Sequence, residues 1–350
     1  MPSKKIRKGM ILAAGLGTRL RPVTLDQPKP LVPVLNIANL MYNVFLLKQA
    51  GVEEIVINLH HLGNKIKSFF ETQDLGIRFS FTQEDILLGT GGGVKNAEKL
   101  LQGEPFILAN CDFITDLDLK PIIEQHFKRK SLATMVLLDD PMMQSFYSPV
   151  GVDQDNHLCS LPSLEVRVPK RTGIFTGIHV LDPSVFEHLL SKPSGINQTL
   201  YPALMKQSPE RIFGHFTDSF WFDTGDLYFL WLTSMQLLER LNEKKHQYTA
   251  TLLETLGGYT ETQPGVWLAD KASIPKNCTL SAPVVIGKNC KIGKGASIGP
   301  FAVLGDESEV GEGARLKRYV ALPKSKVSAH SNFEGGMLYE DRMLPTKKLS

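Results

Sequence analysis

The sequence predicts an α/β protein, built on a mostly parallel β-sheet, that continues into a left-handed parallel β-helix. Two periodicities carry this prediction. Up to about Phe222, short apolar runs alternate with amphipathic segments of helical length, a pattern typical of parallel strands covered by helices on both faces. From Leu268 to Leu322 every sixth residue is aliphatic, which is typical of the coils of a parallel β-helix. The 350 residues leave room for both parts.

The first part contains apolar runs of strand length separated by amphipathic segments. The expected strands are Met10–Ala13, Glu54–Asn58, Ile77–Phe81, Phe106–Ala109, Leu132–Leu138 and Phe175–Val180. The expected helices are Met41–Ala50, Asn64–Thr72, Val94–Leu101 and Leu119–Lys130. Ligands bind at the carboxyl ends of such strands. The loop after the first strand and the turn from Asn110 to Asp112 are therefore candidate binding segments.

The last part repeats with a period of six residues. The aliphatic position recurs at Leu268, Ile274, Leu280, Ile286, Ile292, Ile298, Leu304, Val310, Leu316 and Leu322, and glycine follows at 287, 293, 299, 305 and 311. Four residues after an aliphatic position stand the small residues Ala272, Cys278, Cys290, Ala296, Ala302 and Ala314. Aliphatic residues point into a triangular coil and small ones fit its corners. At roughly eighteen residues per coil, the run makes about three coils.

A helix is expected between the two parts, from about Leu227 to Leu253. The predicted domains are an α/β domain in residues 1–235, a linker helix in 236–263, and the β-helix with its tail in 264–350.

An anion-binding loop is expected where the first strand ends. Leu12 to Val34 reads LAAGLGTRLRPVTLDQPKPLVPV, a stretch that carries Arg19 and, between two prolines, Lys29. Gly15 and Gly17 allow a tight turn whose N–H groups face an anion. Two fixed cations beside backbone amides suit the phosphates of a nucleoside triphosphate. An ordinary tight turn with solvated cations is the alternative.

The order of residues in this loop is more specific than its parts. A dinucleotide fingerprint needs a small residue where Leu20 stands and a helix that Pro22 interrupts, and a P-loop needs Gly-Lys-Ser/Thr, which is absent. The order Gly-x-Gly-Thr-Arg, Pro22 and Pro28-Lys29-Pro30 closely resembles the signature of sugar-1-phosphate nucleotidyltransferases, also called nucleotide-sugar pyrophosphorylases. The elements from about Lys8 to Leu230 follow that family's order. With its hexapeptide tail, the chain especially resembles bacterial mannose-1-phosphate guanylyltransferase-like proteins and generic sugar-nucleotide synthases.

The resemblance implies a Rossmann-like nucleotidyltransferase domain and roles for its loops. We assign Arg19 to the β- and γ-phosphates and Lys29 to the α-phosphate and the sugar phosphate, as the catalytic residues. The implied nucleotide-binding residues are Ala13, Ala14, Gly15, Gly17, Thr18, Gln83, Glu84, Gly89 and Thr90. For the segment EDILLGTGGG, a helix entry with glycines for close packing is the alternative.

Two aspartates are the expected metal ligands. Asp112 follows a buried strand, where a lone Asp could equally cap a turn. Asp223 lies in Trp221-Phe222-Asp223-Thr224-Gly225, which resembles the family's Trp-x-Asp-x-Gly element. Mg²⁺ prefers a few carboxylates together with phosphate oxygens and water, so this pair would suffice. Asp226 is expected to cap the following helix instead.

The sugar-binding elements are where this chain departs most from the family pattern. Gly151, Thr176 and Gly177 resemble the sugar-side elements, although a β-bulge would also explain Gly177. Many members hold the sugar phosphate with the Lys of a Glu-Lys-Pro motif. This chain has EVRVPKR instead, so Lys170 is assigned to that role and Arg171 is the alternative. Cys111 also stands where members commonly have Gly.

The predicted reaction is attack by a sugar 1-phosphate oxygen on the α-phosphorus of a nucleoside triphosphate, which gives an NDP-sugar and expels pyrophosphate. The phosphate oxygen is already ionised near neutral pH, so catalysis needs alignment and charge neutralisation rather than a general base. The best-fitting pair is GTP with mannose 1-phosphate. The alternatives are a uridylyl- or adenylyltransferase acting on glucose 1-phosphate or an amino sugar 1-phosphate, and a catalytically silent NDP-sugar-binding regulatory subunit.

A second activity in the β-helix is not expected. Hexapeptide acyltransferases place a His at the seam between subunits, and no His lies between Leu268 and Leu322. The β-helix is expected to be structural and to mediate formation of a homo-oligomer.

Composition excludes several other classes of protein. The formal charge is +3, from 39 basic and 36 acidic residues, so no affinity for nucleic acid is implied. The apolar runs are too short for a membrane span, and no apolar segment of a secretory signal follows the basic start. The four cysteines lack metal-binding spacing, so a reduced, cytoplasmic protein is expected.

Overall fold

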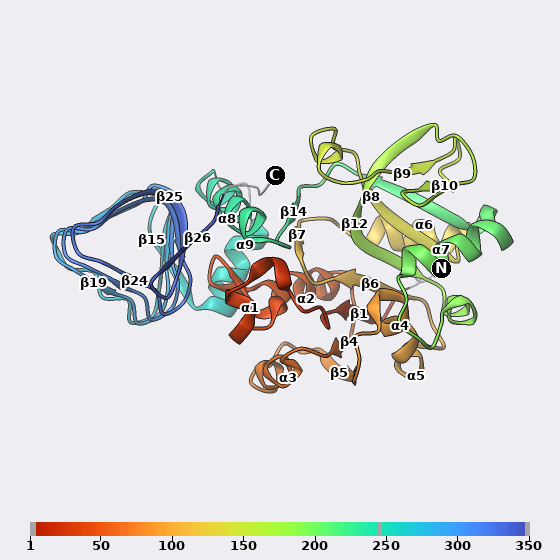
Figure 1. Ribbon diagram of the computed structural model, residues 1–350, viewed down its shortest axis with the longest axis horizontal. Helices are drawn as coiled ribbons and strands as arrows, with labels where there is room; N and C mark the ends of the chain where they lie inside the picture. The colour runs from red at the N-terminus through yellow and green to blue at the C-terminus, as the bar shows by residue number, and fades with distance from the viewer. Residues whose placement is uncertain (1–4, 244–246, 347–350) are drawn as a thin grey trace. The chain divides into compact units, whose positions relative to one another are not determined.

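A mixed β-sheet organises the first part of the chain in the computed structural model, which describes residues 5–243 and 247–346 (Figure 1). In order across the sheet, its main strands are β5 (Arg78–Gln83), β4 (Glu54–Leu59), β1 (Lys8–Leu12), β6 (Phe106–Asn110), β12 (Arg171–Leu181), β8 (Ala133–Leu138) and β13 (Ile212–Thr217). The first four run parallel to one another, and β12 runs antiparallel to both β6 and β8. The prediction of a mostly parallel sheet is therefore confirmed.

The strands form where the apolar runs are. All six residues of β8 are buried, as are five of the six in β4, because such strands are covered on both faces. The covering helices include α3 (Gly63–Glu71), which packs on β4 and β5, and α6 (Lys120–Arg129), which packs on β8 and β12. Among the predicted strands, the observed start differs most from the predicted one in β12, which begins at Arg171 rather than at Phe175.

A small antiparallel extension pairs with the start of β12. It consists of β9 (Val150–Val152), β10 (Leu158–Leu161) and β11 (Leu164–Glu165). The register of β12 against β8 shifts between Phe175 and His179, at the position of Gly177, whose φ is +89°. The bulge expected as an alternative at Gly177 is therefore present.

The prediction of one helix over Val94–Leu101 is wrong in two respects: the helix begins earlier, and it is interrupted. The structure has α4 (Gly89–Asn96) and then α5 (Glu98–Leu101), so the helix begins within the glycines. Glycine is a poor helix former, but a Cβ on Gly92 would lie 2.6 Å from the carbonyl oxygen of Lys192. Tertiary packing at short range thus decides the residue type here, and propensity does not.

The segment after Asp226 also differs from the expected single helix. The Asp226 side chain accepts the Phe229 N–H and caps α8 (Leu227–Asn242), as expected. Helix α8 ends at Asn242, and a separate α9 (Gln247–Leu252) leads into a π-helical turn. The strand β15 (Tyr259–Gln263) then occupies the end of the predicted linker helix.

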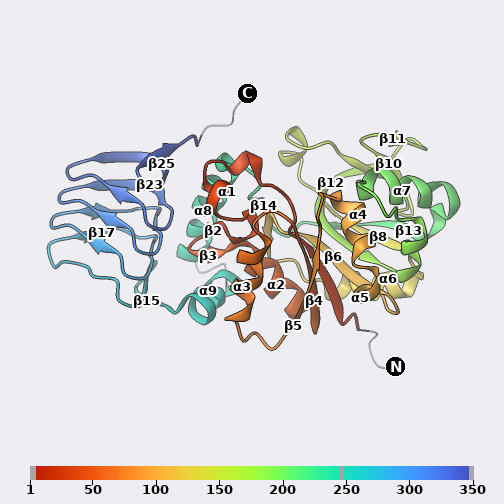
Figure 2. The same cartoon turned by 60° about the horizontal axis from the view of Figure 1, so that its bottom comes forward.

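The hexapeptide part forms the predicted left-handed β-helix, whose stacked coils form a triangle in Figure 1 and appear edge-on in Figure 2. One face is built from β16 (Val266–Ala269), β18 (Val284–Ile286), β21 (Ala302–Leu304), β23 (Arg315–Ala321) and β25 (Asn332–Tyr339). These strands pair in parallel, each with the next. The stack continues to Leu338, beyond the run from which three coils were predicted.

The six-residue period ends earlier than the sequence pattern indicates. Ala302 pairs with Tyr319, a spacing of 17 residues, whereas Val284 pairs with Ala302 at 18. The residue in register with Leu304 is therefore Ala321, not Leu322. Leu322 is still buried, although it lies one residue beyond the position that is in register with Leu304.

The described residues separate by their contacts into two compact units. Within the described residues, the first comprises 5–16, Asp26–Pro30 and Asn43–Trp221, and the second comprises Gly17–Leu25, Leu31–Tyr42, 222–243 and 247–346. The segment Leu12–Val34, called the signature loop from here on, is thus divided between them. Among the helices of residues 5–243 and 247–346, none has both the length and the apolar composition needed to cross a bilayer.

Buried His126 on α6 makes stability depend on pH. Burial lowers the pKa of His126 to about 4 from 6.5, with the charge of Asp182 opposing this shift, and its Nδ1 lies 3.0 Å from Thr134 Oγ1. The unfolded chain binds a proton near pH 6.5 and the folded chain does not. The free energy of unfolding should therefore be unaffected by this group above pH 6.5 and fall as the pH drops from 6.5 to 4.

The change His126→Gln removes the titrating group. We expect the loss of unfolding free energy between pH 6 and pH 5, measured by urea unfolding, to be smaller in the variant by about 1 kcal/mol. Buried His179, whose pKa is lowered to about 3 by burial, leaves a remaining slope. Equal slopes in the two proteins would contradict this assignment.

Candidate functional site

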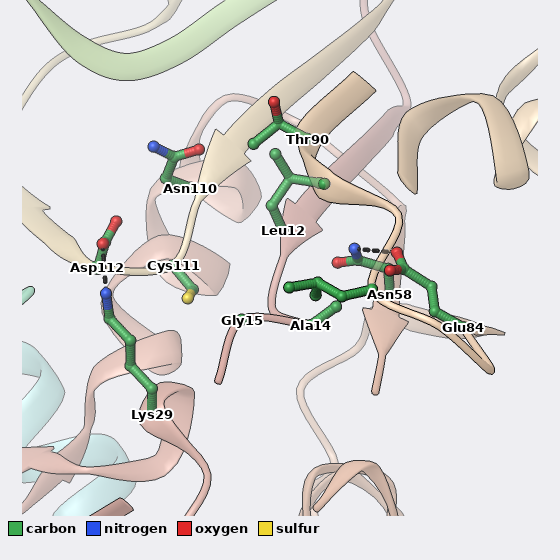
Figure 3. A pocket seen from close by; sticks show the side chains of 12 residues that line it. Leu12, Ala14, Gly15, Lys29, Asn58, Glu84, Thr90, Asn110, Cys111 and Asp112 are labelled. Atoms are coloured by element: carbon green, nitrogen blue, oxygen red, sulfur yellow. Dashed lines mark hydrogen bonds and ion pairs between the residues drawn. The ribbon is translucent and has the colours of Figure 1, made fainter. Parts of the chain in front are cut away.

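A pocket opens at the carboxyl edge of the parallel strands in the first unit (Figure 3). The loops that follow β1, β4, β5 and β6 all emerge there because these strands are parallel. The pocket is lined by Leu12, Ala14, Gly15, Lys29, Asn58, Glu84, Leu87, Gly89, Thr90, Asn110, Cys111 and Asp112. Seven of the residues assigned from sequence are in this set: Ala14, Gly15, Lys29, Glu84, Gly89, Thr90 and Asp112.

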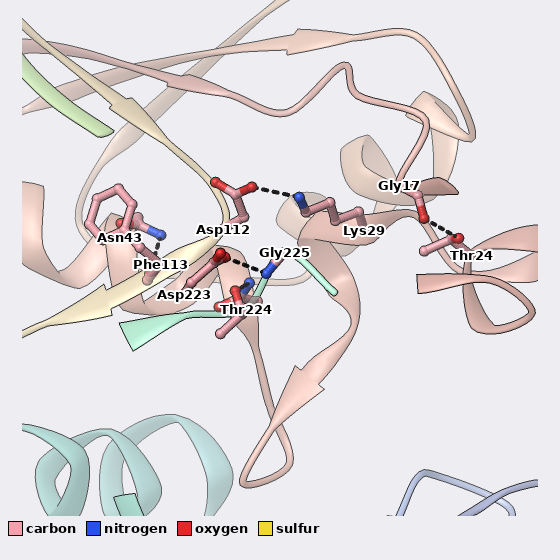
Figure 4. Close-up of polar contacts among 10 residues, drawn as sticks. Gly17, Thr24, Lys29, Asn43, Asp112, Phe113, Asp223, Thr224 and Gly225 are labelled. Atoms are coloured by element: carbon pink, nitrogen blue, oxygen red, sulfur yellow. Dashed lines mark hydrogen bonds and ion pairs between the residues drawn. The ribbon is translucent and has the colours of Figure 1, made fainter. Parts of the chain in front are cut away.

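The charged pair of the pocket is Lys29 and Asp112. Lys29 begins a short 3₁₀ turn, η2 (Lys29–Leu31), and Asp112 lies between β6 and β7 (Phe113–Thr115). Lys29 Nζ lies 2.6 Å from Asp112 Oδ2 (Figure 4). The two side chains are only 12% and 25% exposed, so solvent screens the pair less than it would on the surface. The pocket thus presents one cation and one carboxylate side by side.

The thiol of Cys111 is unsuited to nucleophilic chemistry. Burial, followed by the charge of Asp112, raises the pKa of Cys111 to about 12. The thiolate is the reactive form of cysteine, and this thiol is neutral near pH 7. Cys111 is therefore a small, buried side chain at the position where members of the resembled family commonly have glycine.

The two glycines of the loop, Gly15 and Gly17, have different structural roles. The φ of Gly17 is +62°, which favours glycine, and its carbonyl accepts a hydrogen bond from Thr24 Oγ1 at 2.7 Å. A Cβ on Gly15 would have no heavy atom within 4 Å. The backbone at Gly15 is therefore open to an approaching group, whereas Gly17 is needed for the turn itself.

Sequence reasoning missed Asn58 as a site residue. Its side chain is buried, accepts the Ala13 N–H at 2.7 Å and donates to Glu84 Oε1 at 2.7 Å. A polar residue at the end of an apolar strand was the available signal. Leu12 and Leu87 also line the pocket and were not assigned, whereas Asn110 and Cys111 lie in the turn that was expected to bind ligand but received no role of their own. Leu12 and Leu87 have side chains typical of any core, so nothing in their type indicates a pocket.

Thr90 has a structural contact in addition to its place in the pocket. Its Oγ1 accepts the backbone N–H of Ile196 at 2.8 Å, at the start of α7 (Ile196–Gln207). The N–H groups of Gly91 and Gly92 bond the carbonyl of Ser194. The packing alternative for the glycine segment therefore holds, and the loop also lines the pocket. Gln83 is exposed and outside the lining set, with its carbonyl bonded to Asn96 Nδ2.

The other catalytic candidate, Arg19, belongs to the second unit with Thr18 and Asp223. Thr18 and Arg19 are exposed on the 3₁₀ turn η1 (Thr18–Leu20). Asp223 is buried, and its Oδ1 accepts the Gly225 N–H at 2.6 Å (Figure 4). A Cβ on Gly225 would lie 2.8 Å from both Arg19 Nη2 and Asp223 Oδ1. Gly225 therefore gives the guanidinium room beside this carboxylate.

The sugar-side candidates of the first unit lie outside the lining set. Gly151 is in β9, where a Cβ would lie 2.5 Å from Pro169 Cβ. Thr176 is buried, its Oγ1 donates to the Val136 carbonyl, and its own carbonyl accepts from Trp221 Nε1. Lys170 is exposed, and its N–H bonds the Val152 carbonyl.

Gly177 approaches the end of β6 closely. A Cβ there would lie 3.1 Å from Asn110 Nδ2 and from the Phe113 ring. Glycine at this position therefore leaves room for Asn110, which itself lines the pocket.

One group of three possible metal ligands occurs within the described parts of the chain: Asp153, Asp155 and His157, in the turn between β9 and β10. Asp153 Oδ1 accepts the N–H groups of Asp155 and His157, and Oδ2 pairs with Arg167 at 3.2 Å. Burial opposes ionisation of Asp153, but these hydrogen bonds and charges outweigh it and lower its pKa. Turn formation accounts for the group without an ion.

The chemistry available in the pocket is electrostatic. Lys29, Asp112 and the open backbone near Gly15 can bind anions and a divalent cation, and the cysteine is not a nucleophile. Positioned charges of this kind stabilise phosphoryl transfer.

Comparisons with known proteins agree with this chemistry. The sequence matches the family described as nucleotidyl transferase over residues 8–240, and bacterial transferase hexapeptide (six repeats) over residues 283–318. Probable mannose-1-phosphate guanylyltransferase 3 of Oryza sativa subsp. japonica is 28% identical over 332 residues, 93% of this chain and 86% of that protein. UTP-glucose-1-phosphate uridylyltransferase of Synechocystis sp. is 28% identical, over 81% of this chain and 79% of that protein.

A solved structure supports the same comparison. HddC from Yersinia pseudotuberculosis, complexed with GMP-PN, is 26% identical with a TM-score of 0.53, and the match covers 66% of this chain and 100% of that one.

Two glycines of the first unit allow a direct test of the pocket loop. Gly89 and Gly76 have similar φ values, +69° and +62°, but a Cβ on Gly89 would lie 2.7 Å from Ser194 O, whereas Gly76 has open space. Gly76→Ala should cost roughly 1 kcal/mol of unfolding free energy, from the backbone alone. Gly89→Ala should cost roughly 2–4 kcal/mol, because the Ser194 backbone must also move. Equal costs in urea unfolding would show that the Ser194 contact is unimportant.

Proposed function

The chain belongs to the nucleotidyl transferase family, and we propose that it transfers a nucleotidyl group from GTP to mannose 1-phosphate, releasing pyrophosphate. The observation that carries the proposal is the pocket that places Lys29, Asp112 and the open backbone near Gly15 at one edge of the parallel sheet. Several relatives are named mannose-1-phosphate guanylyltransferases, which supports this pair of substrates. Uridylyl transfer to glucose 1-phosphate is the second candidate, supported by the relative from Synechocystis.

The proposed mechanism depends on charge and alignment. Lys29 holds the α-phosphate and the incoming sugar phosphate, so that an oxygen of the sugar phosphate attacks the α-phosphorus opposite the departing pyrophosphate. Arg19 neutralises the β- and γ-phosphates. Ala13, Ala14, Gly15, Gly17 and Thr18 are proposed to surround the phosphates, and Gln83, Glu84, Gly89 and Thr90 the nucleoside. A sugar phosphate oxygen is a sufficient nucleophile without a general base.

Enzymes of this family generally depend on a divalent metal ion. Asp112 fits Mg²⁺ because its carboxylate oxygens are hard donors in the pocket and leave room for phosphate oxygens and water. We propose Asp112 and Asp223 as the ligands. The ion would draw electron density from the phosphate oxygens and neutralise their charge. Lys29 would then exchange its bond to Asp112 for one to the bound phosphate.

Two further features complete the proposal. For the sugar, Gly151, Thr176, Gly177 and Lys170 are the candidates. Lys170 is preferred to Arg171 because the Arg171 guanidinium pairs with Asp139 and lies 3.7 Å from the Phe216 ring centroid.

For assembly and location, we propose a homo-oligomer formed through the β-helix and a cytoplasmic enzyme. The four free cysteines support the location.

The proposed reaction is tested by pyrophosphate release with Mg²⁺. GTP, UTP, ATP, CTP and dTTP should each be combined with mannose, glucose and amino sugar 1-phosphates. We expect the highest kcat/KM with GTP and mannose 1-phosphate. A preference for UTP with glucose 1-phosphate would select the second candidate. Absence of release with every pair, together with a thermal shift caused by NDP-sugars, would identify a regulatory binding protein instead.

The charged residues are tested in the same assay. Arg19→Ala and Asp112→Ala should each lower kcat by about 10²–10³, the scale expected for loss of one electrostatic group. Lys291→Ala is the matched control, because it removes a cation whose side chain is 77% exposed on the β-helix, and it should leave kcat unchanged. Normal turnover of both site variants would refute the assignment.

A further inference from the structure

A buried hydrogen-bonded chain connects the two loops that border the pocket. Asn58 and Glu84 are each 2% exposed, although both line the pocket. Asn58 Oδ1 accepts the Ala13 N–H at 2.7 Å, and Asn58 Nδ2 donates to Glu84 Oε1 at 2.7 Å. Glu84 Oε2 accepts the Leu88 N–H at 2.9 Å. Figure 3 shows the bond between the two side chains.

The position of these hydrogen bonds at the edge of the sheet allows them to hold neighbouring loops in place. Ala13 follows β1, Asn58 lies near the end of β4, and Glu84 follows β5. These three strands are neighbours in the order β1, β4, β5. One side-chain pair therefore spans the carboxyl edge and holds both the start of the signature loop and the loop that leads to Gly89.

The surroundings leave this arrangement little freedom. A Cβ on Gly93 would lie 2.8 Å from Glu84 Oε1 and 2.9 Å from Asn58 Nδ2, so helix α4 packs directly against the pair. The Glu84 backbone is also held, since its N–H bonds the Leu59 carbonyl and its carbonyl lies 2.8 Å from His60 Nδ1.

We propose that Asn58 and Glu84 are positioning residues for the nucleotidyl transfer reaction. They form a brace that places the start of the signature loop and the segment 85–88, which leads into α4, in register. Glu84 borders the nucleoside in the proposed function, but it acts through Leu88 and Asn58 rather than by bonding the base itself. Each carboxylate oxygen already accepts one hydrogen bond from the protein. The inference rests on the proposed function for its kinetic readout, and its structural readout is independent of that function.

Either single substitution should break the brace, one by placing two hydrogen-bond donors together and the other by placing two acceptors together. Glu84→Gln offers one acceptor and one donor where Asn58 and Leu88 both donate, so one donor faces another. Asn58→Asp places two carboxylates in contact. Each variant should lower kcat/KM for the nucleotide by roughly 10–100-fold, as expected for misplaced binding groups.

The double variant Asn58→Asp/Glu84→Gln should restore all three hydrogen bonds of the brace. The bond between the two side chains would run in the opposite direction, from the residue at position 84 to the residue at position 58. The new Asp accepts from Ala13 N–H and from the Gln amide, and the Gln oxygen accepts from Leu88 N–H. All three hydrogen bonds are then satisfied. We expect kcat/KM to recover to within about threefold of the wild type. If the Glu84 carboxylate bound the base directly, moving it to position 58 would leave the nucleotide KM as high as in the Glu84→Gln single variant, and the proposal would fail.

Glu54→Gln is the matched control. Glu54 lies at the opposite end of β4, where it accepts a hydrogen bond from Ser80 on β5 at 2.8 Å. The substitution alters a side-chain bond between the same two strands away from the pocket, and it should leave kcat/KM unchanged. A loss equal to that of Glu84→Gln would mean that the brace has only a general structural role.

Amide hydrogen exchange of the substrate-free protein tests the brace without the reaction. Ala13 and Leu88 should be protected in the wild type and the double variant, and both should lose protection in each single variant. Loss at only the nearer amide would overturn the coupling of the two loops. If the wild type released no pyrophosphate with any substrate pair, the proposed function would fail, while these exchange data would still decide whether the brace exists.

Discussion

The parallel pairing of β1 with both β4 and β6 is the constraint on which the rest of the site depends. Gly9 pairs with Ile55 on one side and with Ile107 on the other, so the three strands end at the same edge and their loops must meet there. The polar residues of the pocket follow from this arrangement. Asn58 lies near the end of β4, and Asp112 follows β6 within two residues of Asn110. If β1 slipped by one residue, its side chains would turn to the other face of the sheet, and the Ala13 N–H would no longer lie opposite Asn58.

Buried polar contacts then convert this edge into a specific site. Asn58 and Glu84 satisfy each other and two backbone N–H groups away from solvent, where an unpaired group would be costly. Lys29 and Asp112 form a pair that stays partly accessible. The first pair is therefore suited to holding loops in place, and the second to exchanging partners when a phosphate or a metal ion binds. The two proposed roles within one pocket therefore agree with the different exposures of the two pairs.

The sequence allowed much of the fold to be predicted because its periodicities are direct consequences of geometry. The β8 run is buried along its whole length, and the hexapeptide aliphatics Ile286, Ile298 and Leu304 have no exposed surface. Predictions failed where contacts distant in sequence decide the conformation. Positions 91–93 are glycine although they lie inside a helix, because a side chain there would collide with residues 192–195 or with the Asn58–Glu84 pair. Leu322 falls out of register because one turn of the β-helix is a residue shorter, which a six-residue period does not reveal.

The sequence by itself determined which residue types are available to the site: a glycine-rich loop with Arg19 and Lys29, followed by an aspartate at a strand end, is the pattern from which anion and metal binding are proposed. Only the tertiary structure decided which residues meet. It brought Lys29 to Asp112 and revealed that Asn58, an ordinary strand residue in the sequence, connects Ala13 with Glu84. The physical reason is that residue type sets the charge and hydrogen-bonding capacity of each side chain, whereas the partner that satisfies them is chosen by strand order and register.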